Sequence, residues 1–250
     1  SGQSGYGEIW TMRSDGSEPR QITDSGRVQV GTPSWSPDGR QIGFNGLIDE
    51  SFDVYLVDAA GGVPRPFTDE PSTEGGPIWS RDGRWVYFMS NRTGRPEIWK
   101  KRTGGGDAIQ VTFAGGYQAR ESPDGRWLYY VKSIRRPGIP ESIPPEGAPG
   151  VFRMPLGGGP EERVVPEGAF GRWTLSRTGV YLLNNGNPER APSIELFPYE
   201  TWERRTIKEF PRGSRFGMAN SITVSLDDRW IVYAKYDYTA SDLMLLDDYQ

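Results

Sequence analysis

Three observations predict that this chain of 250 residues has an all-β fold of repeated four-stranded antiparallel sheets, a β-propeller. A turn phrase recurs at residues 36–40, 80–84 and 122–126, where it reads SPDGR, SRDGR and SPDGR. Each copy is followed at once by a run of alternating apolar residues, such as residues 85–89. Successive copies lie roughly 43 residues apart, a period typical of radially repeated β-sheets.

The second complete repeat shows how four strands fit into this period. Its turn contains Asp82 and Gly83, and these residue types favour a turn because Asp binds its local backbone and Gly accepts positive φ. A second turn is predicted at the glycines of residues 104–106. The strands expected from this repeat are residues 77–80, 85–89, 97–100 and 109–112.

The repeat boundaries raise a question about how many blades the fold contains. Both ends of the chain offer a third strand, at residues 9–10 and 244–245, so they do not interlock cleanly. The sequence therefore favours six blades, with a first blade that is incomplete or closed by N-terminal strands, and leaves five blades as the alternative. We expect one domain, residues 1–250, with repeats at about 1–32 (partial), 33–76, 77–118, 119–171, 172–220 and 221–250 (partial).

Composition excludes several classes of function. The sequence contains no cysteine and no histidine, which rules out Ser-His-Asp and Cys-His catalysis and histidine-ligated metals. We expect no cofactor. The net charge of −4 comes from mixed signs without a basic stripe, which argues against direct nucleic-acid binding.

The sequence also bears on membranes and processing. No stretch approaches the ~20 apolar residues of a membrane span. No basic-then-apolar leader precedes the repeats, and the sequence begins at Ser1 rather than Met. We therefore expect a mature product, an excised domain or an incompletely recorded chain.

The turn phrase and the strands around it resemble the WD40-like PD40 repeat of TolB-type β-propellers. The resemblance is strong in the first three complete repeats, weaker at residues 177–179, where the aspartate is lost, and altered at residues 225–229, where aspartate replaces glycine. Residues 121–130 and the tail from Val224 are similar to bacterial PD40 propellers fused behind winged-helix regulators or kinases. The resemblance implies a sensor or interaction domain in a periplasmic or otherwise extracytoplasmic location, with the cytoplasm as the alternative.

Two conspicuous groups of residues have a structural explanation. Asp38, Asp82 and Asp124 invite a catalytic or calcium-binding interpretation, but each lies in a turn where Asp and Gly are favoured for backbone reasons. Packing between blades explains the recurring tryptophans better than carbohydrate stacking does. These tryptophans are Trp35, Trp79, Trp85, Trp99 and Trp127.

The candidate binding residues lie on the long connections of the predicted blades. Loops joining strands four to one and two to three emerge on one rim, and they are longer and more varied than the turns on the other rim. Arginine and aromatic residues gather there, the types that dominate protein interfaces, and function concentrates on loops carried by a rigid scaffold. The candidates at this rim and at the expected channel mouth are Arg95, Tyr117, Arg120, Glu121, Phe170, Arg172, Trp173, Arg215 and Phe216.

The sequence thus predicts a non-enzymatic propeller that binds a protein or peptide on its long-loop rim. One alternative is a regulator's sensing domain that holds a small anion bidentately near Arg120 and Arg172. An ion pair between Arg120 and Glu121, or one across blades, is the structural explanation of the same residues. Two further alternatives are an accessory propeller of a peptidase and a subunit that self-associates through an open blade edge.

Overall fold

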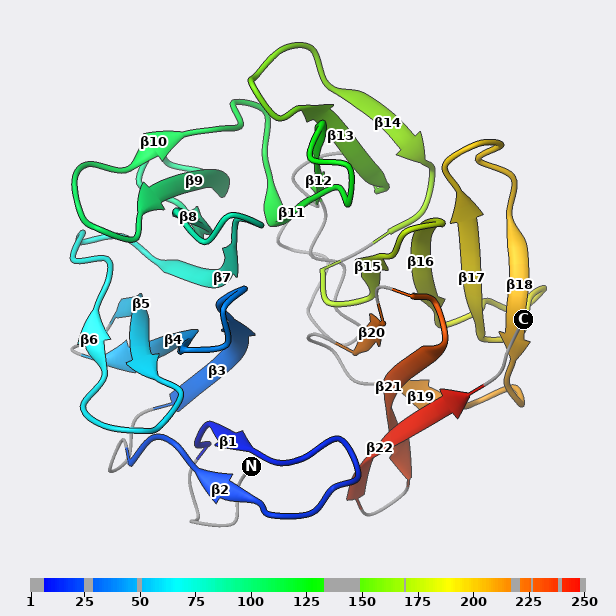
Figure 1. The fold of residues 1–250 in the computed structure, drawn as a ribbon. Coiled ribbons are helices and arrows are strands. Elements are labelled where there is room, and N and C mark those ends of the chain that lie inside the picture. Colours follow the sequence, from blue (N-terminus) through cyan, green and yellow to red (C-terminus); the bar gives the residue numbers. More distant parts are fainter. Residues whose placement is uncertain are drawn as a thin grey trace. The chain divides into compact units, whose positions relative to one another are not determined.

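A computed structural model of the chain describes residues 7–24, 29–48, 51–132, 149–168, 170–216, 221–225, 227–237 and 240–247. These residues form 22 strands, and no helix occurs among them (Figure 1). The strands make five four-stranded sheets and one two-stranded sheet. The chain divides into two compact units, Ser1–Ala119 and Arg120–Gln250, which we describe separately.

The first unit contains the two-stranded sheet and two four-stranded sheets, each with its strands in sequence order. Short turns join neighbouring strands, as the phrase at residues 36–40 predicts. The strands are β1 (Trp10–Thr11) and β2 (Arg20–Gln21), then β3 (Gln29–Trp35), β4 (Gln41–Ile48), β5 (Ser51–Asp58) and β6 (Arg65–Pro66), then β7 (Glu74–Trp79), β8 (Trp85–Ser90), β9 (Glu97–Arg102) and β10 (Ile109–Gln110).

The other three sheets belong to the second unit, except that the first strand of the first of them begins within the first unit, at Tyr117. Two of these sheets again run in sequence order: β11 (Tyr117–Glu121), β12 (Trp127–Val131), β13 (Val151–Pro155) and β14 (Glu162–Val165), then β15 (Trp173–Leu175), β16 (Gly179–Asn184), β17 (Ser193–Pro198) and β18 (Arg205–Glu209). The last sheet contains β19 (Arg215–Phe216), β20 (Ile222–Val224), β21 (Trp230–Asp237) and β22 (Ala240–Asp247).

The last sheet differs from the others in its topology. β22 pairs with β21 along its whole length, so β19 and β20 share the other edge of β21 and together act as one interrupted first strand. Among the described strands β22 pairs only with β21. Self-association through such an edge stays a prediction.

The structure corrects the predicted blade number from six to five. The first repeat supplies only its third and fourth strands, β1 and β2, and these pair with each other as a separate two-stranded sheet. The last repeat places its strands in a sheet of its own. Six blades were favoured because the partial repeat at the N-terminus was counted as a sixth blade. Ring closure and the single domain of residues 1–250 stay predictions.

The recurring aspartates hold turns, as the sequence predicts. Ser36 Oγ donates to Asp38 Oδ1 over 2.6 Å, and the same carboxylate accepts from the Arg40 backbone N–H over 3.1 Å. The backbone N–H of Gln41 donates to Ser36 Oγ over 2.9 Å. Gly39 has a φ of +69°, which glycine adopts without strain. Equivalent bonds recur at Ser80, Ser122 and Ser225.

This turn makes the stability of the fold sensitive to acid. Hydrogen bonds, first of all from the serine hydroxyls, lower the pKa of Asp82 and Asp124 to about 2. In the unfolded chain the value is about 3.9, so the charged turns stabilise the fold above about pH 4, and this contribution is lost as the pH falls towards 2. We expect urea unfolding midpoints to fall less steeply over this range in Asp82→Asn/Asp124→Asn than in the parent chain. If the urea midpoints of the variant and the parent fell equally steeply with pH, this explanation would be wrong.

Apolar side chains fill the space between neighbouring sheets within each unit. In the first unit, one cluster joins Val54 and Leu56 of β5 to Val86 and Phe88 of β8. Trp79 belongs to this cluster, and its Nε1 donates to the backbone oxygen of Ser34 over 3.1 Å, which confirms a tryptophan packed between sheets. Trp35 and Trp85 differ: Trp35 is half-exposed, and Trp85 stacks with Lys100 and Arg102 of its own sheet.

Candidate functional site

Each sheet of the first unit fixes a carboxylate at the start of its third strand. Thr68 Oγ1 donates to Asp53 Oδ1 over 3.1 Å and accepts the backbone N–H of Val54 over 2.9 Å. In the next sheet Thr112 binds Glu97 and the N–H of Ile98 in the same way, over 2.6 and 2.8 Å. Glu8 and Thr23 form a third copy beside β1. An acid and a threonine 15 residues later are thus part of the repeat; the acid is buried at Glu8 and Glu97 and half-buried at Asp53.

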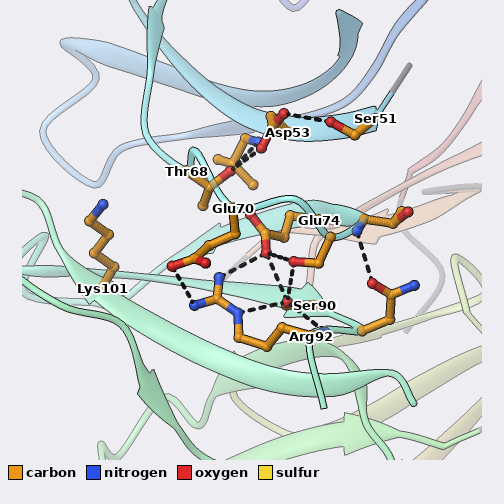
Figure 2. Close-up of polar contacts among 12 residues, drawn as sticks. Ser51, Asp53, Thr68, Glu70, Glu74, Ser90, Arg92 and Lys101 are labelled. Carbon is orange, nitrogen blue, oxygen red and sulfur yellow. Dashed lines mark hydrogen bonds and ion pairs between the residues drawn. The ribbon is translucent and has the colours of Figure 1, made fainter. Parts of the chain in front are cut away.

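A further carboxylate, Glu74 of β7, lies at the centre of a polar network (Figure 2). Glu74 is 0% exposed, and its Oε1 accepts bonds from Arg92 Nη2 (2.7 Å), Ser72 (2.6 Å) and Ser90 (2.8 Å). The guanidinium of Arg92 also lies 4.6 Å from the Trp99 ring centroid and pairs with Glu70 over 3.4 Å.

This network fixes its side chains and leaves little freedom for a ligand. Burial, with the nearby charges of Glu74 and Asp69, raises the pKa of Asp53, although hydrogen bonds from Thr68 and Ser51 oppose the shift. The residues that the structure describes contain no group of three or more His, Cys, Asp or Glu side chains able to hold a metal. We therefore interpret the network as a structural support of the first unit.

Two predicted site residues, Arg95 and Tyr117, lie in the first unit. Arg95 is half-exposed, and its Nε donates to Glu97 Oε1 over 2.7 Å while the same guanidinium binds the Phe113 backbone oxygen. Tyr117 is buried at the start of β11. The structure thus uses Arg95 to tie a loop to a buried carboxylate, and it places Tyr117 in the interior.

In the second unit, the structure brings the predicted residues Arg120 and Trp173 together. The Arg120 guanidinium carbon lies 5.8 Å from the Trp173 ring centroid. Arg120 Nε and Trp173 Nε1 are both buried and have no hydrogen-bond partner among the described residues. Burial lowers the pKa of Arg120 to about 10. The expected ion pair of Arg120 with Glu121 is not found in the described part of the chain.

Arg172 is a second arginine buried without an acidic partner among the described residues. It is 7% exposed, and its one hydrogen bond to a described residue is a 3.5 Å contact from Nη2 to the Phe216 backbone oxygen. Nη1 has no partner in the same part of the structure, and burial lowers the pKa of this side chain.

The remaining predicted residues differ in their exposure. Phe216 packs in the core, with its ring centroid 4.7 Å from that of Phe210. Phe170 is half-buried, and Arg215 is exposed at the start of β19. Phe216 therefore contributes to packing and is not part of the site proposed below.

The unpartnered donors of Arg120, Trp173 and Arg172 come from the edge strands β11 and β15 or from the residue just before β15. Three further buried donors without a described partner lie elsewhere: Nε1 of Trp10 and of Trp99, and Nε of Arg190. Counting back from Ser122 and Ser80 places Arg120 where the preceding repeat has Ile78, an apolar position. The other repeats have uncharged residues at this position, namely Ser34, Ile78, Thr174 and Thr223. A cation at a position that is otherwise uncharged was the signal available in the sequence; the burial of the donors was not. Chemically, buried N–H donors with positive charge and no acceptor suit an anionic oxygen ligand.

Sequence analysis missed a second feature of the same unit. A hollow of about 810 Å³ lies among the hairpin turns, with Trp127, Tyr129, Arg153 and Tyr199 in its lining. The turns at this end were expected to be short and uniform, and no residue of the hollow was a candidate.

Comparison with known proteins agrees with the observed architecture. Residues 16–138 match the PD40 family, described as the TolB beta propeller domain. The structure of TolB from Acinetobacter baumannii superposes with a TM-score of 0.77 at 21% identity, covering 96% of this chain and 57% of that one. An oligogalacturonate lyase from Vibrio parahaemolyticus gives a TM-score of 0.60 at 13% identity, covering 97% of this chain and 70% of that one. At these identities the likeness concerns the fold alone.

A curated relative extends the comparison at the sequence level. An uncharacterized protein of Agrobacterium fabrum is 35% identical over 129 residues, which are 51% of this chain and 43% of that protein. This chain therefore spans less than two thirds of that relative and of the Acinetobacter TolB. In the ranges that the structure describes, no helix has the length and apolar character needed to cross a bilayer.

Proposed function

We propose, on the premise that residues 16–138 belong to the PD40 family of TolB β-propeller domains, that this chain is a non-enzymatic platform for a protein partner. Its second unit binds an acidic group of that partner, a side-chain or terminal carboxylate, at the donors of Arg120, Arg172 and Trp173. The single observation that carries the proposal is the burial of these N–H donors without partners among the described residues.

The free energy of burying such groups supports the proposal. A buried donor that lacks an acceptor destabilises a protein by about 1–3 kcal/mol, and an unpaired buried charge by more. Arg172 combines both features, since it is 7% exposed and its best contact is 3.5 Å long. A carboxylate from a partner would supply the missing acceptors and charge, and arginine binds carboxylates bidentately.

A protein partner is favoured over a small anion by the residues around these donors. Phe170 lies two residues before Arg172 and is half-buried, and the exposed Arg215 directly precedes Phe216, whose backbone oxygen Arg172 contacts. An aromatic and a cationic group thus accompany the donors. Protein interfaces are enriched in such groups. A sensing domain for a small anion is the second candidate, because it rests on the same unpartnered donors.

The absence of histidine and cysteine from the sequence supports a non-enzymatic role, since the usual nucleophile and base pairs require one of them. An accessory propeller of a larger enzyme stays an alternative, because the fold also occurs in the Vibrio lyase. The family resemblance favours an extracytoplasmic location, which we include in the proposal.

The test is binding of acidic peptides selected from a displayed random library on the purified 250-residue chain. We expect selected peptides to require an Asp, a Glu or a free C-terminal carboxylate, and to bind Arg172→Met at least tenfold more weakly. Arg172→Met should also melt no lower than the parent, because methionine removes an unpaired buried charge. Calorimetry with acetate and citrate alone identifies the small-anion alternative.

Arg229→Met is the matched control, because it removes an exposed arginine from the same unit. It should leave peptide affinity within about twofold of the parent. Peptides that bind Arg172→Met as well as the parent would overturn the proposal. Tight binding of citrate with no peptide binding would replace it with the sensing domain.

A further inference from the structure

The hollow of about 810 Å³ lies at the end of the second unit where the hairpin turns emerge. Its walls come from the β11–β12 turn, the β15–β16 turn, the β17–β18 turn and, through Asp228, the β20–β21 turn. Neither Arg120 nor Arg172 is among its lining residues. The volume is within the range of about 300–1,000 Å³ typical of ligand pockets.

Departures from the repeat account for the hollow. Residues 199–202 (YETW) occupy the hairpin where the preceding two sheets have glycines, at residues 104–106 and 157–159. The hydroxyl of Tyr199 donates to the Ser176 backbone oxygen over 3.1 Å, which fixes this ring.

The β15–β16 turn has also lost the aspartate of the repeat, and its Thr178 hydroxyl donates instead to Asp228 over 3.1 Å. The β15–β16 and β17–β18 turns of this sheet thus differ from the short glycine and aspartate turns of the preceding sheets.

Aromatic rings form one side of the hollow and hold its shape. The Tyr129 and Tyr199 ring centroids lie 5.9 Å apart, and that of Trp202 lies 5.8 Å from Tyr199. Arg153 lies between Trp127 and Trp202, at 4.2 and 5.3 Å from their centroids. Trp202 has a φ of +56°, an unfavourable conformation for a bulky residue that these contacts maintain.

The charges around the hollow are unevenly paired. Arg126 pairs with Asp124, and Arg153 pairs with Glu162. Arg177 and Arg205 are exposed in the lining, and neither has a carboxylate within 4.0 Å in the described part of the chain.

Two of the three lining acids are less available than these two arginines. Asp124 is held by Ser122 and Arg126, Asp228 accepts a bond from Thr178, and Glu200 is the exposed acid among them. The apolar part of the lining includes Leu196 and Ile207.

We propose that this hollow is a docking site for a short peptide segment of a partner protein that carries an aromatic side chain close to an acidic one. The aromatic group fills the space beside the half-buried Trp127 and Tyr199, and the carboxylate pairs with Arg177 and Arg205. Tyrosine, tryptophan and arginine are the residue types that carry most binding energy at protein interfaces. The site is separate from the donors of Arg120 and Arg172.

The experiment measures fluorescence anisotropy of labelled five-residue peptides that contain one aromatic and one acidic residue at varied spacing. We expect the best peptides to bind Arg177→Glu/Arg205→Glu at least tenfold more weakly than the parent. Replacing their acidic residue by its amide should have a similar effect. Arg172→Met should bind them as the parent does, which distinguishes this site from the one proposed above.

Arg40→Glu/Arg65→Glu is the matched control, because it changes the net charge equally. Arg65 lies opposite Leu56 of β5 in the strand register, as Arg205 lies opposite Leu196 of β17. Arg40 lies at a turn of the first unit. This control should keep the parental affinity. The proposal is overturned by equal losses in both double variants, by peptides indifferent to their acidic residue, or by no binding below about 1 mM, which corresponds to about −4.1 kcal/mol.

Discussion

Glu74→Ala is expected to destabilise the fold by about 3–5 kcal/mol, because it removes one partner of a buried ion pair. Glu74 is 0% exposed, and it accepts bonds from Arg92 at 2.7 Å and from the hydroxyls of Ser72 and Ser90 (Figure 2). Without it, both hydroxyls and much of the guanidinium charge lose their acceptor inside the protein. Relief of the repulsion with Asp53 offsets a small part of this loss. Urea unfolding at pH 7 measures the effect.

Glu70→Ala is the control for this experiment, since it removes the same group from the same arginine. Glu70 is 49% exposed and lies 3.4 Å from Arg92, so its loss should reduce the free energy of unfolding by less than about 1 kcal/mol. The two variants have the same net charge. If Glu74→Ala destabilises the fold no more than Glu70→Ala does, burial does not determine how strongly the Glu74–Arg92 pair stabilises the fold.

The local structure of the blades could be predicted because it depends on neighbouring residues. Ser36 and Asp38 form their turn through bonds spanning two to five residues, and the same residue types recur at Ser80 and Ser122. The alternating runs after each turn are β4, β8 and β12. Blade number depended on how the terminal strands pair. β1 pairs with β2, and β21 pairs with β19, β20 and β22. The period of the repeat does not determine which strand edges pair in this way.

The candidate site was predicted less completely because burial and convergence are tertiary properties. Arg120 and Trp173 are 53 positions apart, and only packing of their sheets brings the guanidinium over the ring. Phe216 is of a residue type common at protein interfaces, but it lies in the core beside Phe210. The hollow was missed because the lost aspartate at residues 177–179 was interpreted only as a weaker copy of the repeat, and the replacement of hairpin glycines by residues such as Tyr199 was not considered.

Thr112→Val should destabilise the fold by about 2–3 kcal/mol although it replaces a side chain of almost the same shape. The hydroxyl of Thr112 donates to buried Glu97 over 2.6 Å and accepts the N–H of Ile98 over 2.8 Å. Valine leaves that N–H without this acceptor and the carboxylate without one donor, while Arg95 and the Gly115 N–H still bind Glu97. Thermal and urea unfolding of the purified variant measure the loss.

Two companion variants separate the hydrogen bonds from the change of shape. Thr112→Ser keeps the hydroxyl and should recover most of the lost stability, because both bonds can form again. Thr103→Val makes the same substitution at a half-exposed site, where the hydroxyl lies 3.4 Å from the Arg84 backbone oxygen, and should change stability by less than about 0.5 kcal/mol. The threonine–acid pair recurs at Thr23 and Thr68. If the Thr→Val substitution destabilises the fold strongly only at Thr112, the same motif contributes unequally to stability in the different repeats. If Thr112→Ser is as unstable as Thr112→Val, the methyl contact rather than the hydroxyl stabilises this strand end.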